Sequence, residues 1–226
     1  MNKNPFMYTL HQLKPHIRRR GKVLKDFSEK IGLAYLGSMH QHDDEYDAIR
    51  GFTASTSHRD SNYAVGTYES FDIRVVNRFD VQKQHVNKSS RKITPMAWVV
   101  LEFTLKNLDD APHVFFVPTG GPHSSAYEKV FTANIHMQPL NNTLNQANHS
   151  TSLYGKYQIL SRPTHAGRVA ELLTDPVVFG IGEKLWPQGL EIYKNKLYIY
   201  ISEENITSSI LDTACVSGLW LAKELS

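Results

Sequence analysis

The hydrophobic pattern is most regular in the C-terminal part of the chain, over residues 156–226, where strand and helix signals alternate. A strand is predicted near 154–160, followed by a helix over 164–173 that Thr164 can cap and a second helix over 175–185 that opens with Asp-Pro. Apolar residues then recur at helical spacing over about 205–223, which predicts a helix long enough to cover a sheet.

Between these helices the period changes to two, which predicts a β-hairpin that turns around Asn195. Two two-residue registers remain open, and both give the hairpin one aliphatic and one tyrosine face. The aliphatic face holds Leu190, Ile192, Leu197, Ile199 and Ile201, and the other holds Tyr193, Tyr198 and Tyr200. We expect a neighbouring helix or another chain to cover the tyrosines.

The middle of the chain alternates in the same way and predicts a mainly antiparallel sheet. A hairpin turns at Glu69 and Ser70, a polar connection follows over 82–92, and Val, Phe and Trp mark a strand over 96–105. Residues 113–117 are expected to continue this meander, because the connection is too short for a helical crossover.

Two later segments carry weaker signals. Residues 127–137 are compatible with another strand, while the Asn-rich stretch 141–152 has a loop composition and marks a candidate boundary within the domain.

The N-terminal segment has a helical apolar stripe and a basic side. Pro15 interrupts the stripe, so we predict the main helix from there to Ile31, ended by Gly32. Residues 1–30 hold eight Lys/Arg against two acidic residues, whereas the whole chain carries only +3. The basic excess therefore belongs to this segment, and the candidate partner-binding residues of its helix are Arg18, Arg19, Arg20, Lys22 and Lys25.

Composition limits the class of protein. The chain has 226 residues, 41% of them hydrophobic, which is enough for a packed core. Its single cysteine, Cys215, cannot form an internal disulfide and is expected to be a small buried hydrophobe. No apolar run is long enough to span a membrane, and the first twenty residues lack the apolar core of a signal peptide, so a cytoplasmic location is expected.

Three stretches together resemble an uncharacterised bacterial family of the domain-of-unknown-function kind. They are 66–79 (GTYESFDIRVVNRF), 170–176 (AELLTDP) and 190–200 (LEIYKNKLYIY). The resemblance covers about half of the chain. It implies an α+β fold and brings no catalytic residues with it.

Candidate chemistry is sparse. The densest set of metal-ligand types is His40, His42, Asp43 and Asp44, which on an extended segment could contribute to a zinc or manganese site, with further ligands drawn from His58, Asp60, His113 and His123. The His-x-His pattern of known hydrolases includes an Asp-His pair that is missing here. No nucleophile motif is present, and Ser124 and Ser125 are expected in a loop.

The sequence therefore predicts an α+β protein with a mainly antiparallel sheet, an N-terminal helical segment (1–32) and a single domain (33–226) whose C-terminal helix-hairpin-helix module packs on the sheet. The favoured function is non-enzymatic binding or scaffolding, without a cofactor, through contact of the basic helix with an acidic protein or an anionic membrane surface. The alternatives are a metal-dependent hydrolase and a single-stranded nucleic-acid binder that stacks bases on the hairpin tyrosines. The tyrosine face and the apolar stripe also suggest a homo-oligomer.

Overall fold

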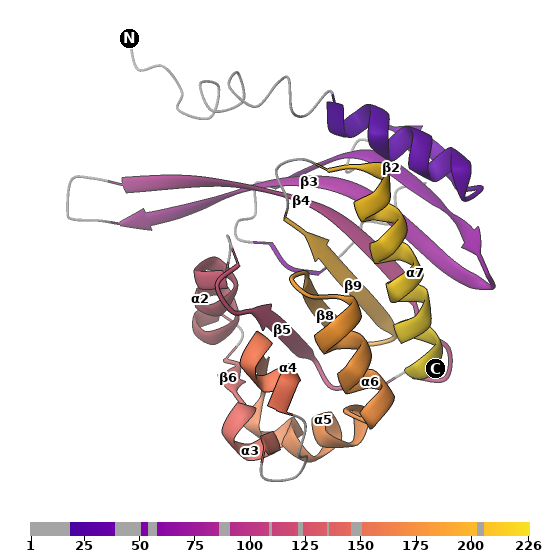
Figure 1. The fold of residues 1–226 in the computed structure, drawn as a ribbon. Helices are drawn as coiled ribbons and strands as arrows, with labels where there is room; N and C mark the ends of the chain where they lie inside the picture. The colour runs from indigo at the N-terminus through magenta and orange to yellow at the C-terminus, as the bar shows by residue number, and fades with distance from the viewer. Residues whose placement is uncertain are drawn as a thin grey trace.

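The computed structural model describes residues 19–38, 51–53, 58–85, 91–108, 110–121, 124–134, 136–145, 151–202 and 206–226. Within them, nine strands form one antiparallel sheet in the order β1-β2-β3-β4-β9-β8-β5-β7-β6 (Figure 1). The strands are β1 (Ala34–Gly37), β2 (Arg59–Tyr68), β3 (Phe71–His85), β4 (Arg91–Thr104), β5 (Val114–Pro118), β6 (Gln138–Pro139), β7 (Tyr157–Ser161), β8 (Gly189–Tyr193) and β9 (Lys196–Ile201). The predicted α+β class is confirmed.

Helices cover both sides of this sheet. They are a helix over 19–30, α2 (Ser124–Asn134), α3 (Asn141–Asn145), α4 (Thr151–Lys156), α5 (Ala166–Leu172), α6 (Asp175–Phe179) and α7 (Ser208–Glu224), with a 3₁₀ turn η1 (Pro163–His165) before α5 and a π-helical turn η2 (Gly180–Lys184) after α6. None of the described helices combines the length and apolarity that a membrane span requires.

The predicted hairpin β2–β3 is confirmed. Tyr68 pairs with Phe71, and both turn residues take left-handed angles, with φ of 46° at Glu69 and 68° at Ser70. Two consecutive positive φ angles are those of a type I′ turn, whose twist matches the strands that it joins.

The polar connection predicted over 82–92 is shorter than expected. β3 continues to His85 and β4 begins at Arg91, and these ends pair with each other. Since β2 pairs only as far as Phe79 of β3, and β9 only from Val99 of β4, the two strands extend beyond the sheet as an arm (Figure 1).

The predicted continuation of the meander from β4 to β5 is wrong. β4 pairs with β9, whereas β5 lies between β8 and β7, so the β8–β9 hairpin occupies the middle of the sheet. The physical reason is burial on both sides. Leu197, Ile199 and the tyrosines Tyr198 and Tyr200 are all at most 2% exposed, as expected for a central strand.

The strand considered over 127–137 is also wrong, because residues 124–134 form α2. Tyr127 and Phe131 are four residues apart, share one face of this helix and are both 1% exposed against the sheet. Ser124 and Ser125 lie in its first turn rather than in a loop. The loop expected over 141–152 contains all of α3 and the start of α4.

The C-terminal predictions hold in part. The strand expected near 154–160 begins only at Tyr157, because 151–156 form α4, and Thr164 lies in η1 instead of capping α5. Thr174 precedes α6, Asp175 and Pro176 lie in its first turn, and the helix continues through η2 to Lys184. The hairpin turn is formed by Lys194 and Asn195, and Lys194 takes the positive φ of 56°.

The helix over 19–30 ends where predicted. Gly32 takes a φ of 78°, its N–H donates to the carbonyl of Glu29, and the next N–H, of Leu33, donates to that of Ser28. This is the Schellman motif, which satisfies the last carbonyls of a helix. Leu24 and Phe27 of this helix are buried in the core.

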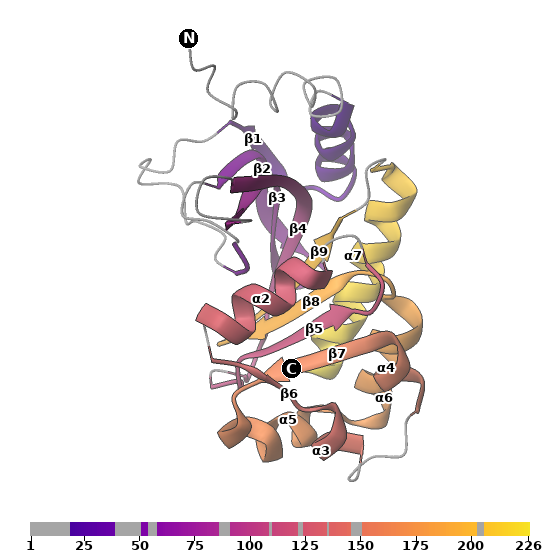
Figure 2. The same ribbon diagram turned by 90° about the vertical axis from the view of Figure 1, so that its left-hand side faces the viewer.

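The alternation along each strand divides the core into two layers. The first face of the sheet, which includes Leu197, Ile199 and Ile201 of β9, packs on α5, α6, α7 and the N-terminal helix. The second face, which includes Tyr198 and Tyr200, packs on α2 and Phe52. Figure 2 shows α2 and α7 on opposite sides of the sheet.

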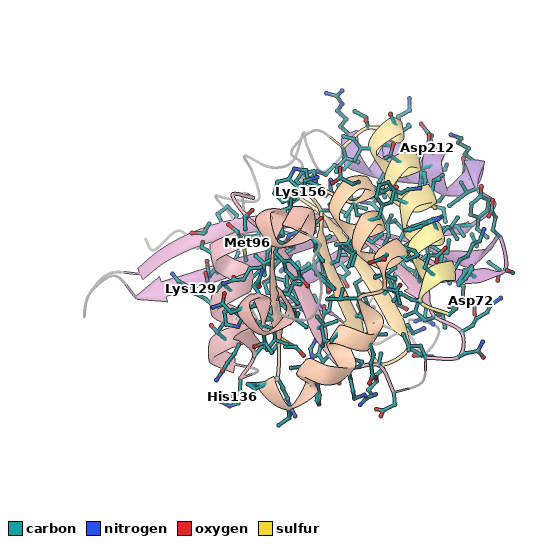
Figure 3. All side chains as sticks on the ribbon, turned by 60° about the horizontal axis from the view of Figure 1, so that its bottom comes forward. Asp72, Met96, Lys129, His136, Lys156 and Asp212 are labelled. Carbon is teal, nitrogen blue, oxygen red and sulfur yellow. The ribbon has the colours of Figure 1, made fainter. Side chains whose placement is uncertain are left out.

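Cys215 of α7 belongs to the first layer, at 2% exposure, and burial raises the pKa of its thiol to about 12. It is the small buried hydrophobe that the sequence predicts. The N-terminal helix and α7 are joined by an exposed ion pair of 2.7 Å between Lys30 and Asp212, the latter labelled on α7 in Figure 3.

Candidate ligand-binding site

A cavity of about 600 Å³ opens on the second face, beside the ends of β8 and β7. Its lining comes from five places: the segment 51–53, residues 110–113 before β5, the second half of α2, the Arg162–His165 stretch after β7, and Glu191–Lys194 of β8 and its turn. We call it the His113 cavity. A volume of this size is within the range of ligand-binding sites.

Glu191 is the buried centre of the polar contacts at the cavity. Leu190 and Ile192 point into the first layer, so alternation directs Glu191 to the second face, where it is 2% exposed. Its Oε1 lies 2.6 Å from His113 Nε2, and its Oε2 accepts hydrogen bonds from the Tyr200 hydroxyl at 2.5 Å and the Phe52 N–H at 3.0 Å. Both carboxylate oxygens are therefore held in fixed positions.

Tyr200 connects this carboxylate to the backbone of the 51–53 segment. Its hydroxyl oxygen accepts a second contact from the Phe52 N–H at 2.6 Å. Burial, followed by the charge of Glu191, raises the pKa of Tyr200 well above its usual value, so the phenol stays protonated. Gly51 has a φ of 101°, and a Cβ there would collide with the Tyr200 hydroxyl, so only glycine allows this close approach.

An ion pair extends the network to β2 and β3. Arg78 donates to both carboxylate oxygens of Asp60, at 2.8 and 2.7 Å, and to the Phe52 carbonyl at 3.2 Å. The two charged side chains are 0% and 4% exposed. Phe52 is thus held through both its N–H and its carbonyl, by side chains of β8, β9 and β3.

Aromatic rings form the apolar part of the cavity wall. Phe52 lies 5.4 Å from the ring of Phe131, which stacks on Phe115 at 4.2 Å. The ring of His113 is 4.4 Å from that of Tyr193. Contacts of this kind keep the wall in one arrangement, because offset and tilted rings attract each other beyond their burial.

The edge of the cavity carries charged residues. Arg162 and Lys194 are exposed, and the Lys194 ammonium lies 5.6 Å from the centre of the Tyr193 ring. Asp110 also lines the cavity, and its carboxylate lies 3.1 Å from the guanidinium of Arg168.

Four of the five residues of the predicted basic contact surface lie in the described part of the chain. Arg18 lies outside the described residues. Arg19, Lys22 and Lys25 are exposed, and Lys25 is 3.7 Å from Glu29 one turn along the helix. Arg20 is 7% exposed, because it lies four residues before the buried Leu24 on the same side of the helix. It therefore does not belong to the exposed basic side.

The predicted metal ligands His40, His42, Asp43 and Asp44 lie outside the described residues, as does the further candidate His123. Asp60 is bound to Arg78, and His113 to Glu191. Within the described ranges, no three His, Cys, Asp or Glu side chains come together as a metal site. Metal binding at His40 and His42 remains a prediction.

The expectation that the hairpin tyrosines are covered is confirmed for Tyr198 and Tyr200, at 2% and 0% exposure. Those two rings cannot stack nucleic-acid bases in this state. Glu191 had no predicted role, although a carboxylate between Leu190 and Ile192 in a strand is a detectable signal. His113 was a candidate only as a metal ligand, and nothing local to it indicates its partner 78 residues away.

Comparisons with known proteins give a fold relationship alone. No family model and no curated protein matches the chain. The crystal structure of the mycobacterial trehalose monomycolate transport factor A, TtfA, matches with a TM-score of 0.60 at 9% sequence identity, over 91% of this chain and 93% of that one. The two proteins share an α+β architecture over almost their whole lengths.

Proposed function

We propose that this protein is a non-enzymatic binding protein that holds a ligand in the His113 cavity. The observation that supports the proposal is the buried network through Glu191, which fixes Phe52 and His113 at the cavity wall. Burying charges is costly unless they are paired, and here the paired groups hold the wall of a cavity open to solvent. We also infer a cytoplasmic location from the single cysteine.

The same contacts favour binding over catalysis. Glu191 is engaged by His113, Tyr200 and Phe52, so it has little freedom to exchange protons with a substrate. Among the described residues, no serine, threonine or cysteine side chain is hydrogen-bonded to the imidazole of His113, as an activated nucleophile would require. The structural neighbour TtfA is called a transport factor, and a non-catalytic role for this chain agrees with that description.

Native mass spectrometry tests this function. The purified protein is incubated with small-molecule extracts of cells, and a mass adduct is expected on the wild type. Val130→Trp places a large ring in the cavity and should abolish the adduct, whereas the same change at Val216, which is 63% exposed on α7, should retain it. Absence of any adduct, equal retention by Val130→Trp, or recovery of a chemically altered ligand would refute the proposal.

The exposed basic side of the N-terminal helix is a second candidate contact. Arg19 and Lys22 are exposed, and they support the proposed docking to an acidic protein or an anionic membrane surface. The double variant Arg19→Gln/Lys22→Gln should lose salt-dependent cosedimentation with anionic liposomes, while Lys106→Gln, an exposed change distant in sequence, should not. Equal liposome binding by the wild type, the double variant and Lys106→Gln would refute docking of this helix to an anionic membrane.

A further inference from the structure

The lining of the His113 cavity is divided between apolar and cationic groups. Phe52, Val130 and Phe131 supply apolar surface from the inner side, and Arg162 and Lys194 supply positive charge at the edge. A ligand that satisfies both parts must itself be amphipathic, because apolar surface gains little from a fully charged molecule and free cations gain little from a hydrocarbon.

The two cations at the edge of the cavity are not ion-paired with its two carboxylates. Of its two carboxylates, Glu191 is buried and hydrogen-bonded by His113, Tyr200 and Phe52, and Asp110 is paired with Arg168. Within the described part of the chain, no carboxylate forms an ion pair with Arg162 or Lys194. The edge therefore carries positive charge that is available to a ligand.

The backbone at Arg162 is held by hydrogen bonds on both sides. It directly follows Ser161, whose hydroxyl donates to the His113 carbonyl at 2.6 Å. Its own carbonyl accepts from the N–H of His165, the last residue of η1, at 2.9 Å. The backbone that carries this guanidinium is thus held beside His113, while the side chain itself is exposed. A guanidinium suits a carboxylate or phosphate group, because it can donate two parallel hydrogen bonds.

We propose that the His113 cavity binds an amphipathic anion, a molecule with a carboxylate or phosphate group on an apolar body. The inference rests on the proposed binding function and adds the class of ligand. The anionic group contacts Arg162 and Lys194, and the apolar body lies against Phe52, Val130 and Phe131.

Isothermal titration calorimetry with octanoate, octyl phosphate and uncharged 1-octanol tests the proposal. One-to-one binding of at least one anion is expected, with weaker binding of the alcohol, and the two anions distinguish carboxylate from phosphate recognition. Arg162→Gln and Lys194→Gln should each weaken anion binding by about ten-fold or more, as loss of a charge-assisted hydrogen bond does. Lys129→Gln is the matched control, because Lys129 is an exposed cation on α2 outside the cavity lining (Figure 3).

Three results would overturn the class of ligand: no saturable binding of either anion, equal affinity for the alcohol, or unchanged affinity in both glutamine variants. These results are separate from a failure of the binding function itself. If the cell-extract adduct is present and depends on Val130 while the octyl anions do not bind, the cavity is a ligand site for a different class of molecule.

Discussion

The first face of the sheet is packed mainly with aliphatic side chains and some aromatic rings, such as Phe103 and Phe116, whereas the second face combines aromatic rings with buried charges. The buried charged residues of the strands, Arg78, Asp80, Glu102 and Glu191, all point to the second face. The same strands supply both layers, since each strand alternates between them. The difference is therefore one of side-chain chemistry within a single backbone arrangement.

The two faces stabilise the protein in different ways. Aliphatic packing on the first face needs no directional contacts, and it stabilises the sheet in proportion to the apolar area removed from water. The second face needs each buried charge to meet its partner at a set distance, as Arg78 meets Asp60 and Glu191 meets His113. The cavity lies on the face whose geometry is specified by these directional contacts.

Breaking the ion pair of the second face is expected to have the largest effect on stability. Arg78→Met leaves the carboxylate of Asp60, only 4% exposed, without its bidentate partner. The loss should be about 3–5 kcal/mol in the free energy of unfolding, measured by urea denaturation.

A second variant identifies the cause of that loss. Asp60→Leu combined with Arg78→Met replaces both charges by apolar groups and should recover part of the stability, since no buried charge has lost its partner while the Phe52 carbonyl still lacks its donor. If Arg78→Met alone lowers the free energy of unfolding by less than about 1 kcal/mol, the Arg78–Asp60 pair contributes no more than an exposed ion pair does.

Removing the Tyr200 hydroxyl tests the next contact of the network. Tyr200→Phe deletes one donor to Glu191, although the carboxylate keeps His113 and the Phe52 N–H. The expected cost is about 1–3 kcal/mol, because a buried charged acceptor loses a hydrogen bond. Chemical denaturation measures it.

Tyr198→Phe is the matched control for this change. Tyr198 is 2% exposed on the same strand and face, and its hydroxyl has no hydrogen bond to a described residue. Its loss should therefore be near zero. Equal losses in the two variants would mean that the Tyr200 effect comes from packing rather than from its contact with Glu191.

Much of the fold follows from local patterns in the sequence. Period-two alternation identified β2, β3 and the β8–β9 hairpin, and Val, Phe and Trp content identified β4. Gly32 marked a helix end. Each of these signals depends on residues close together in the chain. Strand pairing does not follow in this way. Residues 113–117 were correctly predicted as a strand but given the wrong neighbours, since the sequence does not show that β9 and β8 insert after β4.

The α2 segment and the cavity depend still more on distant residues. Tyr127 and Phe131 favour strand by propensity, and their helical form is stabilised by the aromatic surface that they pack against. The cavity forms only where five separate segments meet. Of its lining residues, only Glu191, a carboxylate within an apolar strand, is recognisable from the local sequence.

The smallest effect should come from an ion pair on the other side of the sheet. Lys30 and Asp212 join the N-terminal helix to α7 at 2.7 Å, the same distance as the closer Arg78–Asp60 contact, but their side chains are 61% and 34% exposed. Asp212→Asn should cost at most about 1 kcal/mol, and less in high salt, because water and ions screen exposed charges. Urea denaturation at two ionic strengths measures the difference. A salt-independent loss as large as that of Arg78→Met would show that burial does not set the relative strength of these two pairs.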